Sequence, residues 1–570
     1  MSAPTQDDLR DWQRLALGVL RKSGLAGEDT PPEAVADLLA TETYDGLRIA
    51  PLYTAADRAP DAGAPGHLPF VRGGSTAPRP WDVRQRHADP DPKATRAAVL
   101  ADLENGATSL WLTGVAPADL AEALDGVLLD LAPVVLDHGP LGLEAARAFL
   151  ALPGADKSGN LGLDPLGLEA RTGVESEMSV LSALLDSPVP IATVDATVYH
   201  DAGGNDAQEI GYATATGLAY LRELVAAGLS AGMALKQLEF RFAATADQFA
   251  TIAKLRAARR IWARVAQVCD VPHLGAQRQH AVTSDAMMTA RDPWTNLLRT
   301  TVACFAAGTG GAGAVTVQPF DARLGLPDGF SRRIARNTQS LLIEESGVAR
   351  VLDPAGGSWY VESLTDALAH AAWDVFTEVE RAGEMAAALR SGLVEERIGT
   401  VRQRREADLA HRRQPITGVS EFPDLAERRP VRPPAPVRPS GGLQQMWYSQ
   451  SFEHLRDVAE AASEPPTVRL VALGSTASNS ARVSFAANLF AAGGVRLSED
   501  STSPVACICG SDRSYGEQAA ETAARLKSEG VTTVWLAGQG SYEGVDAYLF
   551  TGCDALDVLR RTHEDLGVAP

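Results

Sequence analysis

The hydrophobic pattern of the chain alternates between short apolar runs and longer helical stretches from about residue 93 to 395. The runs that predict strands are Ser109–Val115, Pro133–Asp137, Pro190–His200, Lys236–Ala243 and Ala314–Phe320. Such alternation is typical of parallel strands joined by crossover helices. The repeats are numerous enough to predict a (β/α)₈ barrel of the TIM type, with a doubly wound sheet as the alternative.

The stretch from Asp247 to Cys269 shows the helical period clearly. Apolar residues recur three and four positions apart, at Ile252, Leu255, Ala258, Trp262, Val265 and Cys269. Thr245 followed three residues later by Gln248 predicts a capping box at the amino end of this helix. The apolar face of the helix is therefore expected to pack inward against the strands.

The segments before the barrel are less regular. Residues 1–44 contain one amphipathic pattern, Leu9 to Leu20, before a break rich in Gly and Pro, and we interpret them as an N-terminal arm. From Ala50 to Asp91 the chain has little periodicity, which predicts an irregular segment lying against a larger body. Residues 45–395 are assigned to the barrel domain.

Residues 396–465 are interpreted as a helical linker rich in Arg and Pro. The arginines are Arg402, Arg404, Arg405, Arg412, Arg413, Arg428, Arg429, Arg432 and Arg438. Because proline-dense sequence resists helix and central strand, the segment is expected to be a semi-stiff spacer. A plain solvated linker is favoured, and a basic strap on the acidic body or on a partner is the alternative.

A second domain is expected over residues 466–570. Strands are predicted at Thr467–Leu473, Pro504–Ile508, Thr532–Leu536 and Ala547–Phe550, with helices at Ser478–Ala492 and Tyr515–Ser528 and another after Asp554. This order predicts a small α/β sheet of the flavodoxin type. Cys507 and Cys509 are expected to share one strand face as buried cysteines without redox chemistry.

Charge and composition argue against some classes of binding partner. The 570 residues include 52 Lys plus Arg against 72 Asp plus Glu, a net charge of −20, which disfavours nucleic acid and anionic membrane. Five cysteines without metal-type spacing indicate a reducing cytoplasm and no metal site. The chain has no long apolar run and no export signal at its start, so a cytoplasmic protein is expected.

Common catalytic motifs are missing from the sequence. No phosphate-binding loop ending in Gly-Lys-Ser/Thr, no His-Glu-x-x-His and no Gly-x-Ser-x-Gly occurs. The glycine-rich run Gly308–Gly313 follows a helical pattern and precedes a strand, the reverse of a phosphate loop. We interpret it as a tight helix-to-strand turn.

Seven motifs together resemble those of adenosylcobalamin-dependent acyl-CoA mutases in order and approximate spacing. They are Pro69-Phe70-Val71-Arg72-Gly73, Arg79-Pro80-Trp81-Asp82-Val83-Arg84-Gln85, Arg278-Gln279-His280-Ala281-Val282-Thr283-Ser284, Asp292-Pro293-Trp294, Ser331-Arg332-Arg333-Ile334-Ala335-Arg336-Asn337-Thr338-Gln339, Glu344-Glu345-Ser346-Gly347 and Asp353-Pro354-Ala355-Gly356-Gly357-Ser358-Trp359-Tyr360-Val361-Glu362. The resemblance covers about residues 45 to 395. It implies a barrel threaded by coenzyme A, followed by a flavodoxin-like cobalamin-binding domain.

The sequence departs from that family at the expected cobalt ligand. Catalytic members carry Asp-x-His-x-x-Gly after the first strand of the cobalamin domain, where the His binds cobalt and the Asp orients its ring. The corresponding loop here begins Gly474-Ser475-Thr476-Ala477-Ser478 and contains neither His nor Asp. We treat Gly474, Thr476 and Ser478 as a degenerate loop and expect no cofactor-binding residue.

The expected reaction pocket is altered as well. The resemblance implies a Tyr between the Arg-Gly and Arg-Pro-Trp motifs, but Gly74–Pro78 contains no aromatic residue. His280 matches the catalytic His of the family, yet the residues after it differ. Because one donor without its supporting neighbours contributes little to catalysis, we interpret His280 as a remnant and expect no catalytic residue in this chain.

Retained barrel motifs with lost ligand and pocket residues are similar to one branch of the family, the small subunits of heterodimeric methylmalonyl-CoA mutases. The resemblance implies an isomerase complex interconverting methylmalonyl-CoA and succinyl-CoA, with adenosylcobalamin and the acyl-CoA substrate bound by a homologous large subunit. The arm and the linker are expected to cross the interface. Two alternatives are an autonomous acyl-CoA mutase with a separate cobalamin-binding partner and an interaction module without mutase activity.

Overall fold

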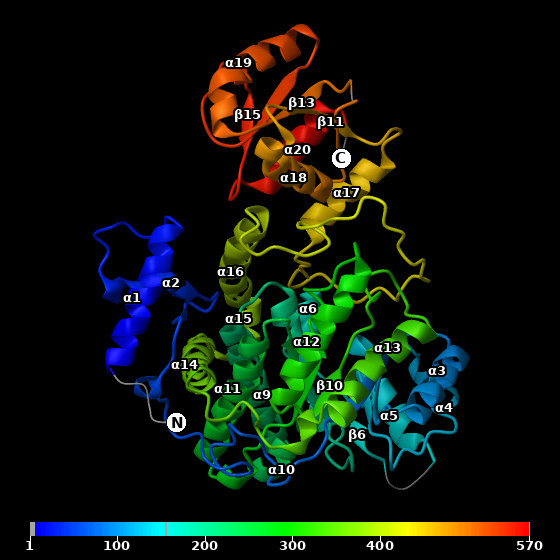
Figure 1. The fold of residues 1–570 in the computed structure, drawn as a ribbon. Helices are drawn as coiled ribbons and strands as arrows, with labels where there is room; N and C mark the ends of the chain where they lie inside the picture. The colour runs from blue at the N-terminus through cyan, green and yellow to red at the C-terminus, as the bar shows by residue number, and fades with distance from the viewer. Residues whose placement is uncertain (1–5, 154–156, 501, 569–570) are drawn as a thin grey trace.

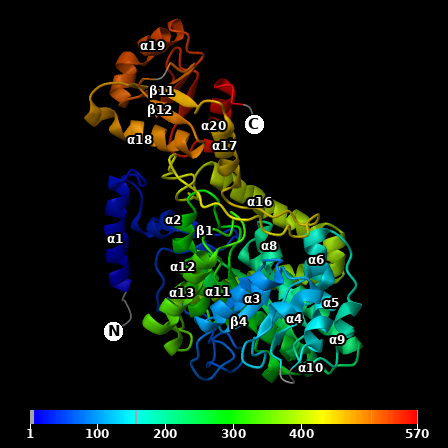
Figure 2. The same ribbon diagram turned by 90° about the vertical axis from the view of Figure 1, so that its right-hand side faces the viewer.

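The computed structural model describes residues 6–153, 157–500 and 502–568. Figures 1 and 2 show a large barrel, a smaller C-terminal sheet above it, and helix α1 (Gln6–Lys22) to one side. No helix in these described ranges combines the length and apolar character needed to cross a membrane.

The barrel has eight parallel strands in sequential order. They are β3 (Asp82–His87), β4 (Ser109–Leu112), β5 (Val134–Leu136), β6 (Gly159–Asn160), β7 (Ala192–Asp195), β8 (Leu238–Ala244), β9 (Gln279–Thr283) and β10 (Ala314–Thr316). Strand β10 pairs with β3, and a single bridge from Leu163 to Ala192 joins the β6 end to β7. This nearly closed order fits a TIM barrel, as predicted, and the doubly wound alternative is wrong for this sheet.

Helices surround the barrel. They are α3 (Pro92–Glu104), α4 (Leu120–Ala123), α5 (Gly142–Ala151), α6 (Pro165–Thr172), α7 (Ser179–Ser182), α8 (Thr197–Asp201), α9 (Asp206–Ala226), α10 (Ala231–Lys236), α11 (Gln248–Val268), α12 (Asn296–Thr309), α13 (Gly329–Ser340), α14 (Trp359–Arg381), α15 (Glu384–Arg390) and α16 (Leu393–Ala410). A Cβ atom at Gly217 of α9 would lie 2.7 Å from Phe240, so the glycine lets α9 approach β8. Gly308–Gly313 is a helix-to-strand turn between α12 and β10, as predicted.

Three local predictions were wrong. The strand expected over Pro190–His200 ends at Asp195, because the Asp195 carboxylate accepts hydrogen bonds from the backbone N–H and the hydroxyl of Thr197 and α8 begins there. Asp247, not Thr245, caps α11. The irregular segment expected up to Asp91 contains strand β3, whose polar side chains conceal its period.

The C-terminal sheet is fully parallel with strand order β12-β11-β13-β14-β15. Its elements are β11 (Thr467–Ala472), α18 (Thr476–Ala492), β12 (Arg496–Ser498), β13 (Val505–Cys509), α19 (Asp512–Ser528), β14 (Thr533–Ala537), β15 (Ala547–Leu549) and α20 (Ala555–Asp565), preceded by α17 (Gln450–Ala461). Helices α18 and α20 cover one face and α19 the other. The Cys507 and Cys509 sulfurs lie 3.8 Å apart on one buried face, as expected.

The arm and the linker both contact the body. After α1 the arm contains α2 (Val35–Leu39) and strand β1 (Thr41–Glu42), which forms an antiparallel hairpin with β2 (Arg48–Ile49) just beyond the arm. Residues 411–449 contain no helix or strand of appreciable length. Arg432 of this stretch pairs with the fully buried Asp321 at 2.5 Å, and Arg438 pairs with Asp285 at 3.1 Å. These two arginines tie the linker to the chain's own acidic residues, as in the strap alternative, while residues 433–440 are exposed to solvent, as in the plain linker.

Candidate functional site

His280 lies inside the barrel on β9 and is completely buried. Its Nε2 is 2.8 Å from the Thr316 hydroxyl, which itself donates to the Arg84 carbonyl. The hydroxyl therefore accepts from His280, so Nε2 carries the proton and Nδ1 accepts from Arg241 Nε at 3.3 Å. Both ring nitrogens are occupied by the protein, which leaves His280 no free donor for a substrate carbonyl.

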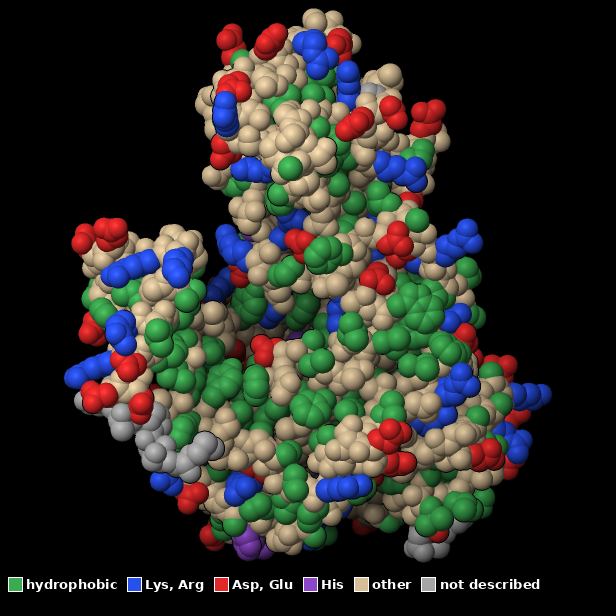
Figure 3. All heavy atoms as spheres, viewed as in Figure 1, with side chains coloured by type: hydrophobic (Ala, Val, Ile, Leu, Met, Phe, Trp, Pro, Cys, Tyr) green, Lys and Arg blue, Asp and Glu red, His purple; other side chains and the backbone are tan. Residues whose placement is uncertain are grey.

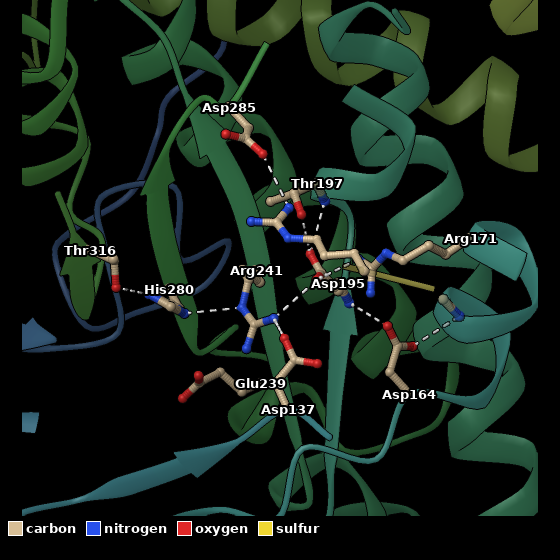
Figure 4. A network of polar contacts seen from close by, with 12 residues as sticks. Asp137, Asp164, Arg171, Asp195, Thr197, Glu239, Arg241, His280, Asp285 and Thr316 are labelled. Atoms are coloured by element: carbon tan, nitrogen blue, oxygen red, sulfur yellow. Dashed lines mark hydrogen bonds and ion pairs between the residues drawn. The ribbon is translucent and has the colours of Figure 1, made fainter. Parts of the chain in front are cut away.

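Arg241 of β8 connects His280 to a group of carboxylates near the carboxyl ends of the strands (Figure 4). Its Nη1 lies 3.0 Å from both Asp137 and Asp195. Asp195 also pairs with Arg171 at 3.2 Å, and its backbone N–H donates to Asp164. These side chains come from the carboxyl ends of β5 and β7, from β8, and from α6 and the loop before it, so they meet only because the barrel closes.

Large side chains fill the rest of the barrel interior. The guanidinium carbon of Arg241 lies 4.1 Å from the ring centre of Trp111, and that of Arg86 lies 4.8 Å from it. One layer nearer the amino end, Arg84 pairs with Glu239 at 2.5 Å. Inward-facing residues of TIM barrels normally pack as apolar layers, so this interior is unusual in containing arginines, of which Arg84 and Arg241 are ion-paired.

The charges inside the barrel set the ionisation of their neighbours. Burial lowers the pKa of His280 well below its usual range, and Arg84 and Arg241 lower it further, so the ring is neutral. Burial alone would raise the pKa of Asp195, but Arg241 and Arg171 outweigh it and hold that pKa below its usual range. Burial, reinforced by the Asp195 charge, raises the pKa of Asp164 to about 7.

The linker covers the carboxyl end of the barrel. The Met446 N–H donates to the Asp201 carbonyl at 2.7 Å, and the Tyr448 N–H donates to the Ala286 carbonyl at 2.9 Å. Asp285, just after β9, accepts from Gln445 at 2.9 Å besides pairing with the linker arginine. The end of a barrel that normally carries the active site is thus crossed by the chain's own backbone.

The degenerate loop lies at the carboxyl end of β11, in the C-terminal sheet. Gly474 has a φ of +78°, and Ser478 in the following helix hydrogen-bonds to the Ser475 carbonyl. Arg482 donates to the Ala537 carbonyl at 2.9 Å across the ends of the strands. Beside it, the Tyr515 hydroxyl donates to the same carbonyl at 2.7 Å and accepts from a backbone N–H. Side chains therefore occupy this edge of the sheet.

Comparison with known proteins gives consistent results. The family model described as methylmalonyl-CoA mutase matches residues 189–481. A Streptomyces virginiae protein named "Methylmalonyl-CoA mutase small subunit" is 54% identical over 597 residues, covering 98% of this chain and 96% of its own length. A "Probable methylmalonyl-CoA mutase small subunit" of Mycobacterium bovis is 41% identical, covering 94% of each chain. The small subunit of Propionibacterium freudenreichii subsp. shermanii is 39% identical, covering 93% of this chain and 90% of its own length.

The chain belongs to the methylmalonyl-CoA mutase family. Mutases of this family use cobalamin, so the fit of the C-terminal sheet to that group can be tested directly. The loop from Gly474 to Val483 contains no imidazole. His563 is buried in α20 with Nε2 bound to the Gly493 carbonyl at 2.8 Å, at the opposite end of α18 from the loop. These residues do not fit a cobalamin held through a histidine.

The sequence patterns of this methylmalonyl-CoA mutase family member predicted some of the site residues but not others. His280 was singled out and lies at the centre of the interior network, whereas Gly474, Thr476 and Ser478 lie in the separate C-terminal sheet. The network residues Arg241 and Asp195 were missed. Each of these two residues is a charged residue in a largely apolar strand. In a closed barrel such a residue can face the interior, and this feature of the sequence could have identified them.

Proposed function

We propose that this chain is the non-catalytic small subunit of a heterodimeric methylmalonyl-CoA mutase. In this proposal a homologous large subunit binds adenosylcobalamin and the acyl-CoA substrate, and the complex interconverts methylmalonyl-CoA and succinyl-CoA in the cytoplasm. The names of relatives that match over nearly the whole chain support the assignment to small subunits.

The filled barrel interior is the observation that carries the non-catalytic part of the proposal. A substrate threading the barrel would have to displace Arg241 and Trp111 and separate ion pairs buried among them. Breaking buried pairs leaves uncompensated charges, which is strongly unfavourable. The occupied nitrogens of His280 and the loop without an imidazole support the same conclusion.

The C-terminal sheet is proposed to be a cobalamin-binding domain that has lost its ligand. Its strand order, with the second strand at one edge and the first strand beside it, is the order of flavodoxin-like folds. We accordingly propose domains at residues 45–395 and 466–570, with an N-terminal arm and a linker. Neither alternative, an autonomous mutase or an interaction module, accounts for the names of the full-length relatives.

The proposal is tested by producing this chain alone and together with the large subunit from the same organism. We expect the pair to convert methylmalonyl-CoA when adenosylcobalamin is added and the lone chain to show no turnover. We also expect no base-off spectral shift when the lone chain is titrated with adenosylcobalamin. Turnover by the lone chain at a rate similar to that of the pair would reject the proposal.

A further inference from the structure

A cavity of about 690 Å³ lies outside the barrel, where the arm, the barrel helices, α16 and the linker meet. Figure 3 shows the surface hollowed between the arm and the body. Its volume is in the range of small-molecule sites, which are mostly apolar with a few polar groups that orient the ligand. The cavity is separate from the barrel interior described above.

One wall of this cavity carries an unpaired guanidinium. Arg405 of α16 is only 7% exposed, and its guanidinium carbon lies 4.1 Å from the ring centre of Tyr44 and 5.0 Å from that of Tyr448. Within the described residues no hydrogen bond or ion pair reaches any of its three nitrogens, and Nε is buried without a partner. By contrast, Arg402 and Arg404 of the same helix pair with carboxylates.

The carboxylates of the cavity are already engaged elsewhere. Asp206 pairs with the buried Lys254 at 2.9 Å, Glu42 pairs with Arg404, and Asp45 accepts from a backbone N–H at 2.7 Å. Asp247 accepts from the amino end of α11. Because buried charges in proteins are normally paired, Arg405 lacks the anion that its position requires.

A second wall is largely apolar. It includes Leu298 and Val302 of α12 together with Leu364 and Leu368 of α14. Arg299 of α12 lies beside them and donates to Thr289, Asn296 and the Thr417 carbonyl. Leu298 is 70% exposed, so this wall also lacks a covering group in the single chain. An occupant that satisfies both walls carries a negative charge at one end and an apolar body at the other.

We propose that this cavity binds a small organic acid, with its carboxylate on Arg405 between Tyr44 and Tyr448 and its apolar body against α12 and α14. A guanidinium gives a carboxylate two parallel hydrogen bonds, and the flanking rings hold it in place. Since Tyr44 belongs to the arm and Tyr448 to the linker, the bound acid would join both segments to the barrel.

The test uses the full chain and hexanoate as the probe, followed by calorimetric titration and thermal unfolding. We expect hexanoate to bind at one site and raise the midpoint of unfolding, whereas hexylammonium, which has the same body and the opposite charge, does not. Arg405→Met should weaken hexanoate binding at least tenfold. The matched variant Arg397→Met, on the same helix but away from Tyr44 and Tyr448, should bind hexanoate as the unmodified chain does.

Two further measurements keep the proposal falsifiable. Arg405→Lys retains the charge without the planar fork, so it should fold and bind hexanoate more weakly than the unmodified chain. Equal binding by the unmodified chain, Arg405→Lys and Arg397→Met would overturn the proposal, as would the absence of hexanoate binding. Loss of hexanoate binding when the large subunit is added would also overturn it, because the cavity would then belong to a subunit interface.

Discussion

Side chains fill the barrel interior and the C-terminal sheet in different ways at the places where such folds usually bind ligands. In the barrel, paired charges around Arg241 and Asp195 occupy the axis. In the sheet, the layer between strands and helices is apolar, with Cys507 and Trp535 fully buried, and Tyr515 bridges the strand ends. Both regions are built on parallel strands whose carboxyl ends are the usual place for ligands.

This difference has consequences for stability. An ionic interior depends on every partner, because removing one charge leaves another buried without compensation. An apolar layer loses only the contacts of the deleted atoms and the cavity that they leave. Single substitutions are therefore expected to affect the barrel more than the sheet.

The largest effect is expected for Arg241→Met. The variant leaves Asp137 and His280 without their buried donor, and we expect the free energy of unfolding to fall by about 3–5 kcal/mol. Urea denaturation measures the change. Arg513→Met on α19 is the control, and its exposed pair with Glu517 predicts a loss below about 1 kcal/mol. Equal losses would contradict the comparison.

The next effect is a pH dependence carried by Asp164. Its pKa is raised to about 7, so the folded chain retains a proton that the unfolded chain releases. This stabilising contribution is complete below the unfolded pKa of about 4. Between that pH and about 7 the free energy of unfolding falls by at most about 1.4 kcal/mol per pH unit, and the contribution is lost once the pH has risen through about 7. Asp164→Asn should remove the loss. We would measure unfolding from pH 5 to 8, and an unchanged slope would refute the assignment. Asp512→Asn, at the exposed edge of the sheet, is the control.

A smaller effect is expected where the linker crosses the barrel. Arg432→Ala removes the cation from the buried Asp321, which among the described residues then has the Ser331 hydroxyl as its one side-chain donor. We expect a loss of roughly 1–3 kcal/mol by thermal unfolding. Arg438→Ala removes a more exposed pair and should change stability by less than about 1 kcal/mol. A larger effect for Arg438 would contradict the strap geometry.

The smallest effect is expected for Cys507→Ala in the sheet. The deleted sulfur touches apolar neighbours and Cys509, so the expected loss is about 1 kcal/mol, similar to deletion of one buried methyl group. Chemical denaturation at pH 6 and pH 8 should give the same difference from the unmodified chain. A loss equal to that of Arg241→Met would remove the distinction between the two regions.

Sequence patterns predicted some parts of this fold well and others poorly. The run Pro133–Asp137 became β5 (Val134–Leu136), because an apolar β-rich run has one plausible structure inside a barrel. Strand β3 was missed, because its inward residues Arg84 and Arg86 are charged and the pattern assumes apolar inward positions. The hydrophobic period therefore did not predict a strand whose inward-facing residues are charged.

By itself the sequence determined the family, the barrel and the loop without an imidazole, since these depend on local motifs and on which residue types are present. Only the tertiary structure decided which charges meet. Arg241 and Asp137 are 104 positions apart along the chain and become partners because β5 and β8 face each other across a closed barrel. Likewise, Arg405 lies between Tyr44 and Tyr448, which come from segments far from each other in the sequence. Pairing of distant residues follows from chain closure, which no local pattern encodes.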